Sequence, residues 1–374
     1  MHILYVYKDY HPVVGGIENH IRDLAEGFAA RRHTVTALVT NPGRQTVEEN
    51  MNGVRVIKAG RLGTVASTPL SLNFLSQLRA LQPDITHLHL PYPVGEVSQL
   101  LGGRGRPYVV TYHADVTRPV QRAIMRLYAP VLHLVLRRAA RVIATSPNYV
   151  QSSPYLRRVR DQVSVVTLSA DPRRFAPRPA DAPPHPPTLL FVGLMRHYKG
   201  VDVLIRALAL LPGEARLMLA GDGPLRGEWE RLCAELGLQK QVTFLGRVPD
   251  EALPGLYQAA DVFVLPAISR AEALGLVMIE AMMSGLPCVT TEIGSGTSYL
   301  VQDGLSGYVV PPRSPAALAE ALNRLIADPA LRARMGAAGR ERALRQFTVE
   351  KMITDVEAIY REVRALTHEI MPSR

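Results

Sequence analysis

A loop that carries Glu272 and a helix that begins at Gly275 together form the strongest candidate for an anion-binding site in this sequence. The loop follows Val262–Leu265, an apolar run that predicts a buried strand. The first N–H groups of a helix have no partner within it, and the helix dipole favours negative charge at that end. A diphosphate is the kind of ligand that such an end binds. The candidates for holding it are the first residues of the helix: Gly275, Leu276 and Val277.

Glu280 lies four residues after Leu276, on the same face of the predicted helix and one turn farther in. Its carboxylate could accept hydrogen bonds from a neighbouring pair of hydroxyls, and Glu272 could accept them from a sugar beyond the phosphates. Two arbitrary glutamates are more often solvated surface residues. The order of strand, loop, glycine and helix favours a binding role here.

A basic turn after the apolar run Leu189–Val192 carries Arg196 and Lys199. Cations at a strand end suit a diphosphate, because arginine offers a planar fork of donors and lysine a point charge. The alternative interpretation is a pair of ordinary surface charges on a turn. Further donor-binding candidates follow the next two predicted strands. They are Gly221, Arg247 and Val248, and the last two residues are candidates for recognising the base.

Two motifs in the N-terminal half place further candidates at strand ends. Gly15 and Gly16 follow the predicted strand Ile3–Tyr7 and begin a helix, and glycines there let the backbone come close to a ligand. His113 lies just past the carboxyl end of the predicted strand Tyr108–Thr111. A histidine in that position can take part in catalysis or serve the packing of the domain.

Histidines also stand at positions 87 and 89, two residues apart and therefore on one face of a predicted strand. Such a pair can bind a metal, but no third ligand is evident in the sequence, and packing is the favoured interpretation. No Asp-x-Asp pair that would suit Mg²⁺ is found at a strand end. We therefore expect no metal, no cofactor and a metal-independent chemistry.

Both halves of the chain alternate short apolar runs with helix-forming segments, which predicts α/β domains with parallel sheets of the doubly wound, Rossmann-like type. Seven prolines between 171 and 187 predict an extended linker, because proline cannot continue a helix or an inner strand. We therefore expect four parts: an acceptor-binding domain at 1–170, the linker at 171–187, a donor-binding domain at 188–347, and a terminal helix within 348–374 that crosses back onto the first domain.

The 374 residues are 47% hydrophobic and 20% charged, which is a globular composition. Two cysteines exclude a disulfide framework, and neither a membrane-spanning run nor the features of a signal peptide are evident, so we expect a cytoplasmic protein. The whole net charge of +10 arises in residues 1–170. Such an asymmetry indicates an anionic partner for that half.

Taken together, these segments resemble the family-4 (group 1) retaining glycosyltransferases of the GT-B fold. The resemblance extends over nearly the whole chain and rests on the following motifs, in the family's order: Gly15-Gly16, Lys199-Gly200, GDGPLR at 221–226, FLGRVPD at 244–250, Glu272-x7-Glu280, EAMMSGLPCV at 280–289 and DGLSGYVVPP at 303–312. It implies two Rossmann-like domains that face each other across a cleft. A nucleotide-sugar donor would be held by the C-terminal domain and an acceptor by the N-terminal one.

The resemblance also implies residue roles. Glu280 would bind the donor ribose and Glu272 the transferred sugar. Arg196 and Lys199 would hold the diphosphate, and His113 would face the reacting sugar from the other domain. Transfer would proceed with retention of configuration.

Two positions depart from the family pattern. Leu194 stands where the family usually has an arginine, and GSGTSYL at 294–300 replaces the usual double glycine. Replacements similar to the second are found among mannosyl- and related hexosyltransferases of polysaccharide and O-antigen synthesis. The expected function is thus transfer of a mannose- or glucose-type hexose from a GDP- or UDP-linked donor to a glycan or lipid-linked acceptor, in cell-surface polysaccharide or glycolipid synthesis.

Other functions remain open at this point. A glycoside hydrolase needs two carboxylates but no diphosphate site. A GT-B enzyme without transferase activity, such as a nucleotide-sugar 2-epimerase, is the nearest rival, and a basic nucleic-acid- or anionic-lipid-binding protein is another. The arginine-rich segment 118–141 has no recognisable nucleic-acid reader motif, so no nucleic acid is expected as partner. Attachment of this segment to the inner face of the plasma membrane is an alternative to simple packing of its apolar residues.

Overall fold

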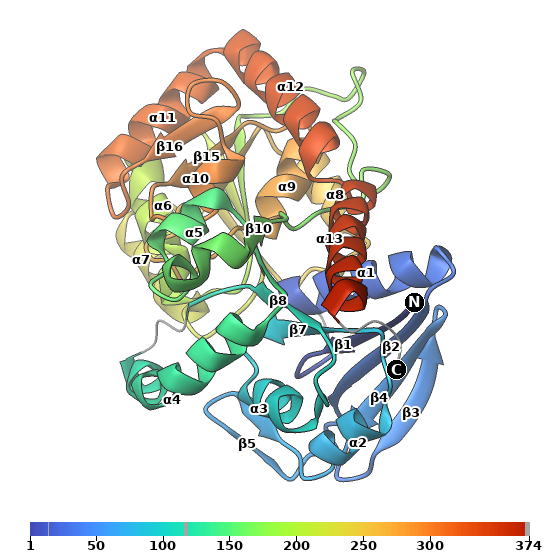
Figure 1. Ribbon diagram of the computed structural model, residues 1–374. Helices are drawn as coiled ribbons and strands as arrows, with labels where there is room; N and C mark the ends of the chain where they lie inside the picture. The colour runs from blue at the N-terminus through green and yellow to red at the C-terminus, as the bar shows by residue number, and fades with distance from the viewer. Residues whose placement is uncertain (14, 116–118, 371–374) are drawn as a thin grey trace. The chain divides into compact units, whose positions relative to one another are not determined.

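The computed structural model describes residues 1–13, 15–115 and 119–370, with the side chains of 119–124 and 367–370 left aside. The chain forms two compact units (Figure 1). The first contains Met1–Leu168 together with the C-terminal segment from Val349, and the second contains Ser169–Thr348. Each unit is built around a sheet of buried strands.

The first unit has a sheet with the strand order β10-β9-β8-β7-β1-β2-β4-β3. Neighbouring strands are parallel, except that β3 pairs antiparallel with β4. The central strands β1, β7 and β8 are buried along nearly their whole length, as expected of a sheet that helices cover on both faces. The bounds are β1 His2–Val6, β2 Thr34–Thr40, β3 Val47–Met51, β4 Val54–Ala59, β7 Ile85–Leu90, β8 Tyr108–Tyr112, β9 Arg141–Ala144 and β10 Val163–Val165, with a separate hairpin of β5 Gly63–Val65 and β6 Thr68–Leu70.

Helices connect these strands, and a C-terminal helix joins them from the far end of the sequence. The bounds are α1 Gly16–Ala30, α2 Phe74–Ala80, α3 Pro93–Gly102, α4 Pro119–Arg138, α5 Pro147–Ser152, η1 Leu156–Gln162 and α13 Val349–Ile370. Helix α13 packs on α1, where Arg31 forms ion pairs with Glu350 and Glu357. A side chain at Gly27 would clash with Ile353, so the two helices approach closely. The predicted return of the terminal helix to the first domain is confirmed.

The second unit has a sheet with the order β13-β12-β11-β14-β15-β16, in which neighbouring strands are parallel. Its strands are β11 Thr188–Val192, β12 Arg216–Ala220, β13 Val242–Gly246, β14 Val262–Leu265, β15 Cys288–Thr291 and β16 Gly307–Val310. Its helices are η2 His197–Lys199, α6 Val201–Leu208, α7 Arg226–Glu235, α8 Leu253–Gln258, α9 Leu276–Met283, α10 Thr297–Leu300, α11 Pro315–Ala327 and α12 Pro329–Gln346. The order is that of a doubly wound fold, so the predicted fold class is confirmed.

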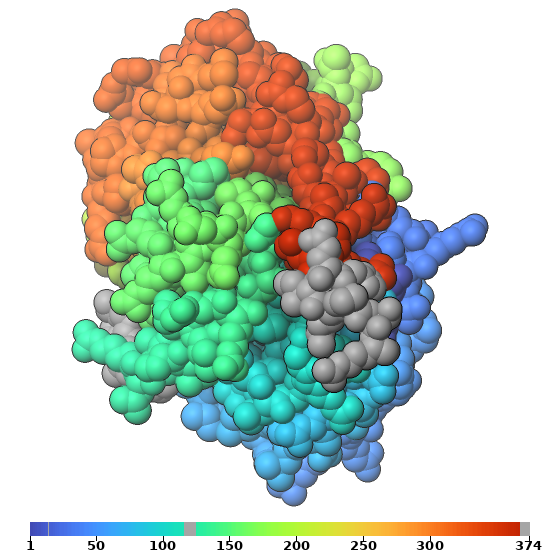
Figure 2. All heavy atoms as spheres, in the orientation of Figure 1, coloured from blue at the N-terminus to red at the C-terminus, as the bar shows by residue number. Residues whose placement is uncertain are grey.

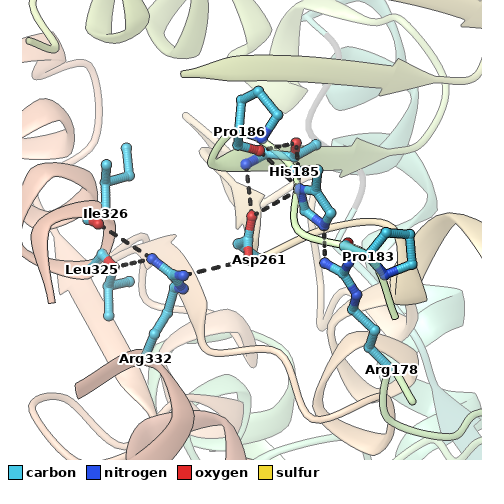
Figure 3. A network of polar contacts seen from close by, with 9 residues as sticks. Arg178, Pro183, His185, Pro186, Asp261, Leu325, Ile326 and Arg332 are labelled. Atoms are coloured by element: carbon cyan, nitrogen blue, oxygen red, sulfur yellow. Dashed lines mark hydrogen bonds and ion pairs between the residues drawn. The ribbon is translucent and has the colours of Figure 1, made fainter. Parts of the chain in front are cut away.

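The proline-rich segment 171–187 contains neither helix nor strand, yet it is anchored to the second unit (Figure 3). Asp261, just before β14, accepts a hydrogen bond from the Thr188 amide at 2.9 Å and lies 3.6 Å from the His185 ring. Arg332 of α12 faces the same carboxylate at 3.5 Å and donates to the last carbonyls of α11. Asp261 thus connects the end of the segment, the sheet and α12. The predicted linker is therefore part of the second unit.

In the part of the chain that the structure describes, no helix is long and apolar enough to cross a membrane.

Candidate functional site

The donor-binding candidates of the second unit meet at one edge of its sheet. Strands β13, β12, β11 and β14 are parallel neighbours, so their carboxyl ends lie side by side. Each of these ends is followed by candidate residues: Arg247 and Val248 after β13, Gly221 after β12, Arg196 and Lys199 after β11, and Glu272 and Gly275 after β14. The structure therefore assembles into one site residues that are spread over 80 positions of the sequence.

The basic turn after β11 is pressed against the loop after β14. Gly200 has a φ of 67°, and a Cβ there would lie 2.1 Å from the Pro266 carbonyl oxygen. The Ile268 amide donates to the Tyr198 carbonyl at 2.9 Å. Glycine is required at 200 both for its left-handed backbone and for this close approach. The contact brings Lys199 beside Glu272.

Lys199 and Glu272 form a buried ion pair. Lys199 Nζ lies 2.5 Å from Glu272 Oε2, and each residue is 8% exposed. At this distance the two charges pair directly. Burial by itself would lower the pKa of Lys199, whereas the Glu272 carboxylate, together with Tyr198, raises it above its ordinary value. Lys199 is therefore a fixed cation at the strand end.

Helix α9 begins at this same edge, after a glycine whose backbone is left-handed. Gly275 has a φ of 87°, and a Cβ there would lie 2.6 Å from the Leu265 side chain. The N–H groups of the first turn of a helix lack intrahelical partners, and the helix dipole adds partial positive charge there. The chain thus combines the N-terminal end of a helix with the Lys199 cation, an arrangement that suits a diphosphate.

Glu280 has a partner that sequence reasoning missed. The Tyr257 hydroxyl donates to Glu280 Oε2 at 2.7 Å and to the Val277 carbonyl at 3.2 Å. Tyr257 is fully buried, against the rings of Phe175 and Phe263. Burial first, and then the Glu280 carboxylate, raise the pKa of this phenol, so it stays a neutral donor. No motif marks Tyr257, because its role depends on the packing of α8 against α9.

Other candidates at this edge serve packing or remain exposed. A Cβ at Gly221 would lie 2.0 Å from the Gly193 carbonyl oxygen, which makes glycine necessary for the packing of the two turns. The Met195 amide donates to the Asp222 carbonyl at 2.9 Å and joins the same turns. Arg196 and Arg247 are exposed, and their side chains can reach outward to a ligand.

The candidates of the first unit lie at the ends of β1 and β8. A Cβ at Gly15 would collide with the Glu18 carboxylate, whereas a Cβ at Gly16 would meet nothing within 4 Å. His113 follows β8 and is 3% exposed, and its Nε2 lies 3.0 Å from His89 Nδ1. Instead of standing free at a strand end, His113 is held by a second buried histidine.

These two histidines belong to a cluster that the sequence pattern did not predict. His20 of α1 packs edge-on against His89 and His113, and His87 stacks on His89 with ring centroids 4.4 Å apart. His87 is hydrogen-bonded at 2.6 Å to both the Tyr360 hydroxyl and the Thr111 hydroxyl. Burial lowers the pKa of each ring, that of His20 to about 3, so the rings are neutral at pH 7.

This cluster has the composition of a metal site but lacks its supporting contacts. One ligand atom from each of His20, His89 and His113 lies within 4.8 Å of the others. The sequence made no third ligand evident, and the structure adds His20 and His113 to His89, whereas His87 is not part of this group. Metal-bound histidines almost always donate their second ring nitrogen to a carboxylate, carbonyl or water. Among the described residues, neither nitrogen of His20 has a partner, and His89 Nδ1 is engaged by His113.

Comparisons with known proteins agree with this architecture. The family model "Glycosyl transferases group 1" matches residues 173–342, and "Glycosyl transferase 4-like domain" matches residues 15–167. Among solved structures, sucrose-phosphate synthase from Thermosynechococcus elongatus superposes with a TM-score of 0.79 at 25% identity, over 98% of this chain and 99% of that one. HepE from Anabaena, determined with UDP and glucose, has a TM-score of 0.76 at 22% identity over 97% of this chain and 100% of that one, and shows the same fold.

Two curated relatives match along almost their whole lengths. The D-rhamnosyltransferase WbpZ of Pseudomonas aeruginosa is 36% identical over 362 residues, which cover 93% of this chain and 92% of the relative. The O-antigen chain mannosyltransferase C of Escherichia coli is 33% identical over 372 residues, which cover 96% and 98%. The fold, the family models and these relatives agree, and the chain belongs to the group 1 glycosyltransferases, with the GT-B fold.

Proposed function

We propose that this enzyme transfers a mannose- or glucose-type hexose from a nucleoside-diphosphate sugar to a glycan or lipid-linked acceptor in cell-surface polysaccharide or glycolipid synthesis. The observation that carries the proposal is the Lys199–Glu272 pair, whose glutamate lies in the loop just before α9, the helix that carries Glu280. The two curated relatives favour the manno configuration, because D-rhamnose is 6-deoxy-D-mannose and the second relative is named for mannose.

In this proposal the second unit binds the donor. The first amides of α9, Lys199 and the exposed Arg196 hold the diphosphate, which compensates for Leu194 at the position of the family's usual arginine. Glu280, oriented by Tyr257, accepts hydrogen bonds from the ribose hydroxyls. Glu272 accepts them from the transferred sugar, and Lys199 balances its charge.

The proposed chemistry is retaining and needs no metal. The bond between C1 of the sugar and the phosphate oxygen breaks, and its electron pair leaves with the diphosphate. The acceptor hydroxyl oxygen bonds to C1 on the same face, and its proton passes to the departing phosphate oxygen. Fixed amides and cations stabilise the charge that develops on the diphosphate, as preorganised electrostatics.

His113 stays a candidate for contacting the reacting sugar. Burial lowers its pKa, so it would act as a neutral hydrogen-bonding group and not as a proton donor. Gly15 and Gly16 stay candidates for a close backbone approach to the same ligand, and the open space around Gly16 favours this role.

We also propose that the acceptor is anionic or lies at an anionic surface, on the cytoplasmic face of the plasma membrane. The excess of positive charge in the first half supports this. Of the arginine-rich segment, Arg118 and the side chain of Arg122 lie outside the described residues. Arg126, Arg137 and Arg138 of α4 are exposed.

A ligand panel tests the proposal. Thermal shifts of the full chain are measured with GDP-mannose, UDP-glucose and ADP-glucose, with and without EDTA. One donor at about a hundredfold excess over its Kd should stabilise the protein by about 2.7 kcal/mol. Glu280→Gln should abolish that shift, whereas Glu341→Gln, an exposed glutamate on α12, should keep it. If no nucleotide sugar shifts the melting temperature of the wild type or of the Glu341→Gln control, the proposal is refuted.

Product analysis separates the enzyme rivals. The anomeric C–H coupling of a product made with the cognate donor reports retention or inversion. Formation of an epimeric sugar without a new glycosidic bond would establish the epimerase instead. Loss of transfer in EDTA, with recovery on adding Mg²⁺, would contradict the metal-independent mechanism.

A further inference from the structure

The hairpin of β5 and β6 and the loop after it present large apolar side chains to solvent. Leu62 is 58% exposed, Val65 61%, Leu70 40% and Leu72 77%. The hairpin is held by its own backbone pairs, among them Leu62 N–H to the Leu70 carbonyl at 2.9 Å. Single exposed leucines are ordinary, but four such residues within eleven positions mark an interaction surface.

Helix α3 extends this apolar surface. Strand β6 and helix α2 both contact α3, and Arg79 of α2 donates to the Leu101 carbonyl at 3.3 Å. Leu101 is 62% exposed, and Val97, one turn before it, is 37% exposed on the same face. Figure 2 shows the light-blue and cyan segments that contain these elements side by side on one face of the first unit. We call the following residues the apolar rim: Leu62, Val65, Leu70, Leu72, Val97 and Leu101.

Most charged residues around the apolar rim are arginines, and one of them, Arg61 next to Leu62, is paired with the Asp9 carboxylate at 2.9 Å. No aspartate or glutamate occurs between positions 50 and 83. Glu96 of α3 is 1% exposed, and its carboxylate accepts hydrogen bonds from the Tyr92 amide and the Tyr128 hydroxyl. It therefore adds no exposed negative charge. Arg79 and Arg104 are exposed cations beside the rim, and the Arg79 guanidinium bonds to a backbone carbonyl and not to a carboxylate.

We propose that the apolar rim is a docking surface for an anionic phospholipid bilayer. Exposed leucines on a hairpin tip can enter the boundary between head groups and acyl chains, while arginines beside them pair with lipid phosphates. An acidic protein surface would satisfy the arginines but not the leucines, and a second copy of this rim would bring like charges together. The inference specifies the surface for the proposed membrane attachment and is independent of the donor site.

Vesicle co-sedimentation of the full chain tests the inference. Vesicles of phosphatidylcholine alone are compared with vesicles that contain about 30% phosphatidylglycerol. The variant Leu62→Ser/Leu72→Ser should bind the anionic vesicles about tenfold more weakly than the wild type, because it removes apolar area that the bilayer would cover. The matched control is Leu210→Ser/Leu305→Ser, which removes two leucines of similar exposure from the second unit and should bind as the wild type does.

A fluorescence readout places the rim in the bilayer directly. Trp229, the single tryptophan of the chain, is 3% exposed and so gives a constant background. In Leu72→Trp, anionic vesicles should shift the emission to the blue, and lipids brominated near the glycerol backbone should quench it. Arg79→Ser/Arg104→Ser should weaken binding and reduce its salt dependence.

Three results would overturn the inference: equal binding to neutral and anionic vesicles, unchanged binding of the Leu62→Ser/Leu72→Ser variant, or no emission shift in Leu72→Trp. A self-association of the wild type that this double variant abolishes, without vesicle binding, would assign the rim to a second copy instead. Donor-induced thermal shifts of the same variants report on the second unit alone. Failure of this inference and failure of the proposed function are therefore distinguishable.

Discussion

Breaking the Lys199–Glu272 pair should destabilise the protein strongly, because either partner alone leaves a buried charge. Each residue is 8% exposed, and the two charged atoms are 2.5 Å apart. Removal of one partner of a buried pair costs about 3–5 kcal/mol, whereas replacement of both by neutral groups of similar volume is often close to neutral. We therefore expect Glu272→Gln and Lys199→Met each to cost about 3 kcal/mol, and the double variant to recover at least half of the summed loss.

The assay is a double-mutant cycle from urea unfolding at pH 7. The pairing raises the pKa of Lys199 above its ordinary value. The contribution of the pair to stability is therefore complete at pH values below the pKa of lysine in the unfolded chain. It is lost only as the pH rises through the higher pKa of Lys199 in the folded protein. The coupling should thus be constant between about pH 6 and pH 9. Additive losses, or single losses below about 1 kcal/mol, would refute the reasoning.

A surface pair of the same unit gives the matched control for this cycle. Arg226 and Glu230 lie 2.7 Å apart at i and i+4 on α7, with both side chains exposed. Solvent screens such a pair, so Arg226→Met and Glu230→Gln should show no measurable coupling. A coupling as large as that of the buried pair would show that burial is not its cause.

Three further outcomes are expected. Tyr257→Phe removes the donor that orients Glu280 and should weaken donor binding about tenfold by calorimetry, and an unchanged Kd would contradict that role. Burial raises the pKa of Glu96 to about 7, so its contribution to stability is complete below its ordinary pKa of 4.5 and is lost as pH rises through about 7. Glu96→Gln should therefore remove about 3 kcal/mol of pH dependence from urea unfolding between pH 4.5 and 8. Gly200→Ala should lower the Tm more than Gly213→Ala, because both positions have a positive φ but only the first substitution adds a clash. Equal losses of Tm would show that the clash does not contribute.

The elements of the fold were largely predictable because their signals are local. Apolar runs bounded by glycine and proline identified the buried strands of both sheets, including β7 and β14. Strand β3 was missed because four of its five residues are exposed, although Asn52 and Gly53, both with positive φ, mark the turn to β4. The β5–β6 turn uses Ala66 and Ser67 in the same left-handed region, and neither residue type signals it.

The candidate site was predictable residue by residue but not as a set of contacts. The types and positions of Glu272, Gly275 and Glu280 were evident because a strand, a loop and a helix N-terminus follow one another in the sequence. The partner of Glu280 was not, because Tyr257 reaches it only when α8 packs against α9. The apolar rim was not predicted either, since exposure depends on what the rest of the unit covers.

The sequence by itself determined the periodicity of strands and helices, the glycines of the turns and the chemistry available at each strand end. These are properties of neighbouring residues, and short-range sterics and hydrogen bonding decide them. Only the tertiary structure decided that β11 lies beside β14, which sets Lys199 against Glu272, and that β1, β7, β8 and α1 gather four histidines. Strand order is a global outcome of burying both faces of a sheet, and the spacing of residues along the chain does not encode it.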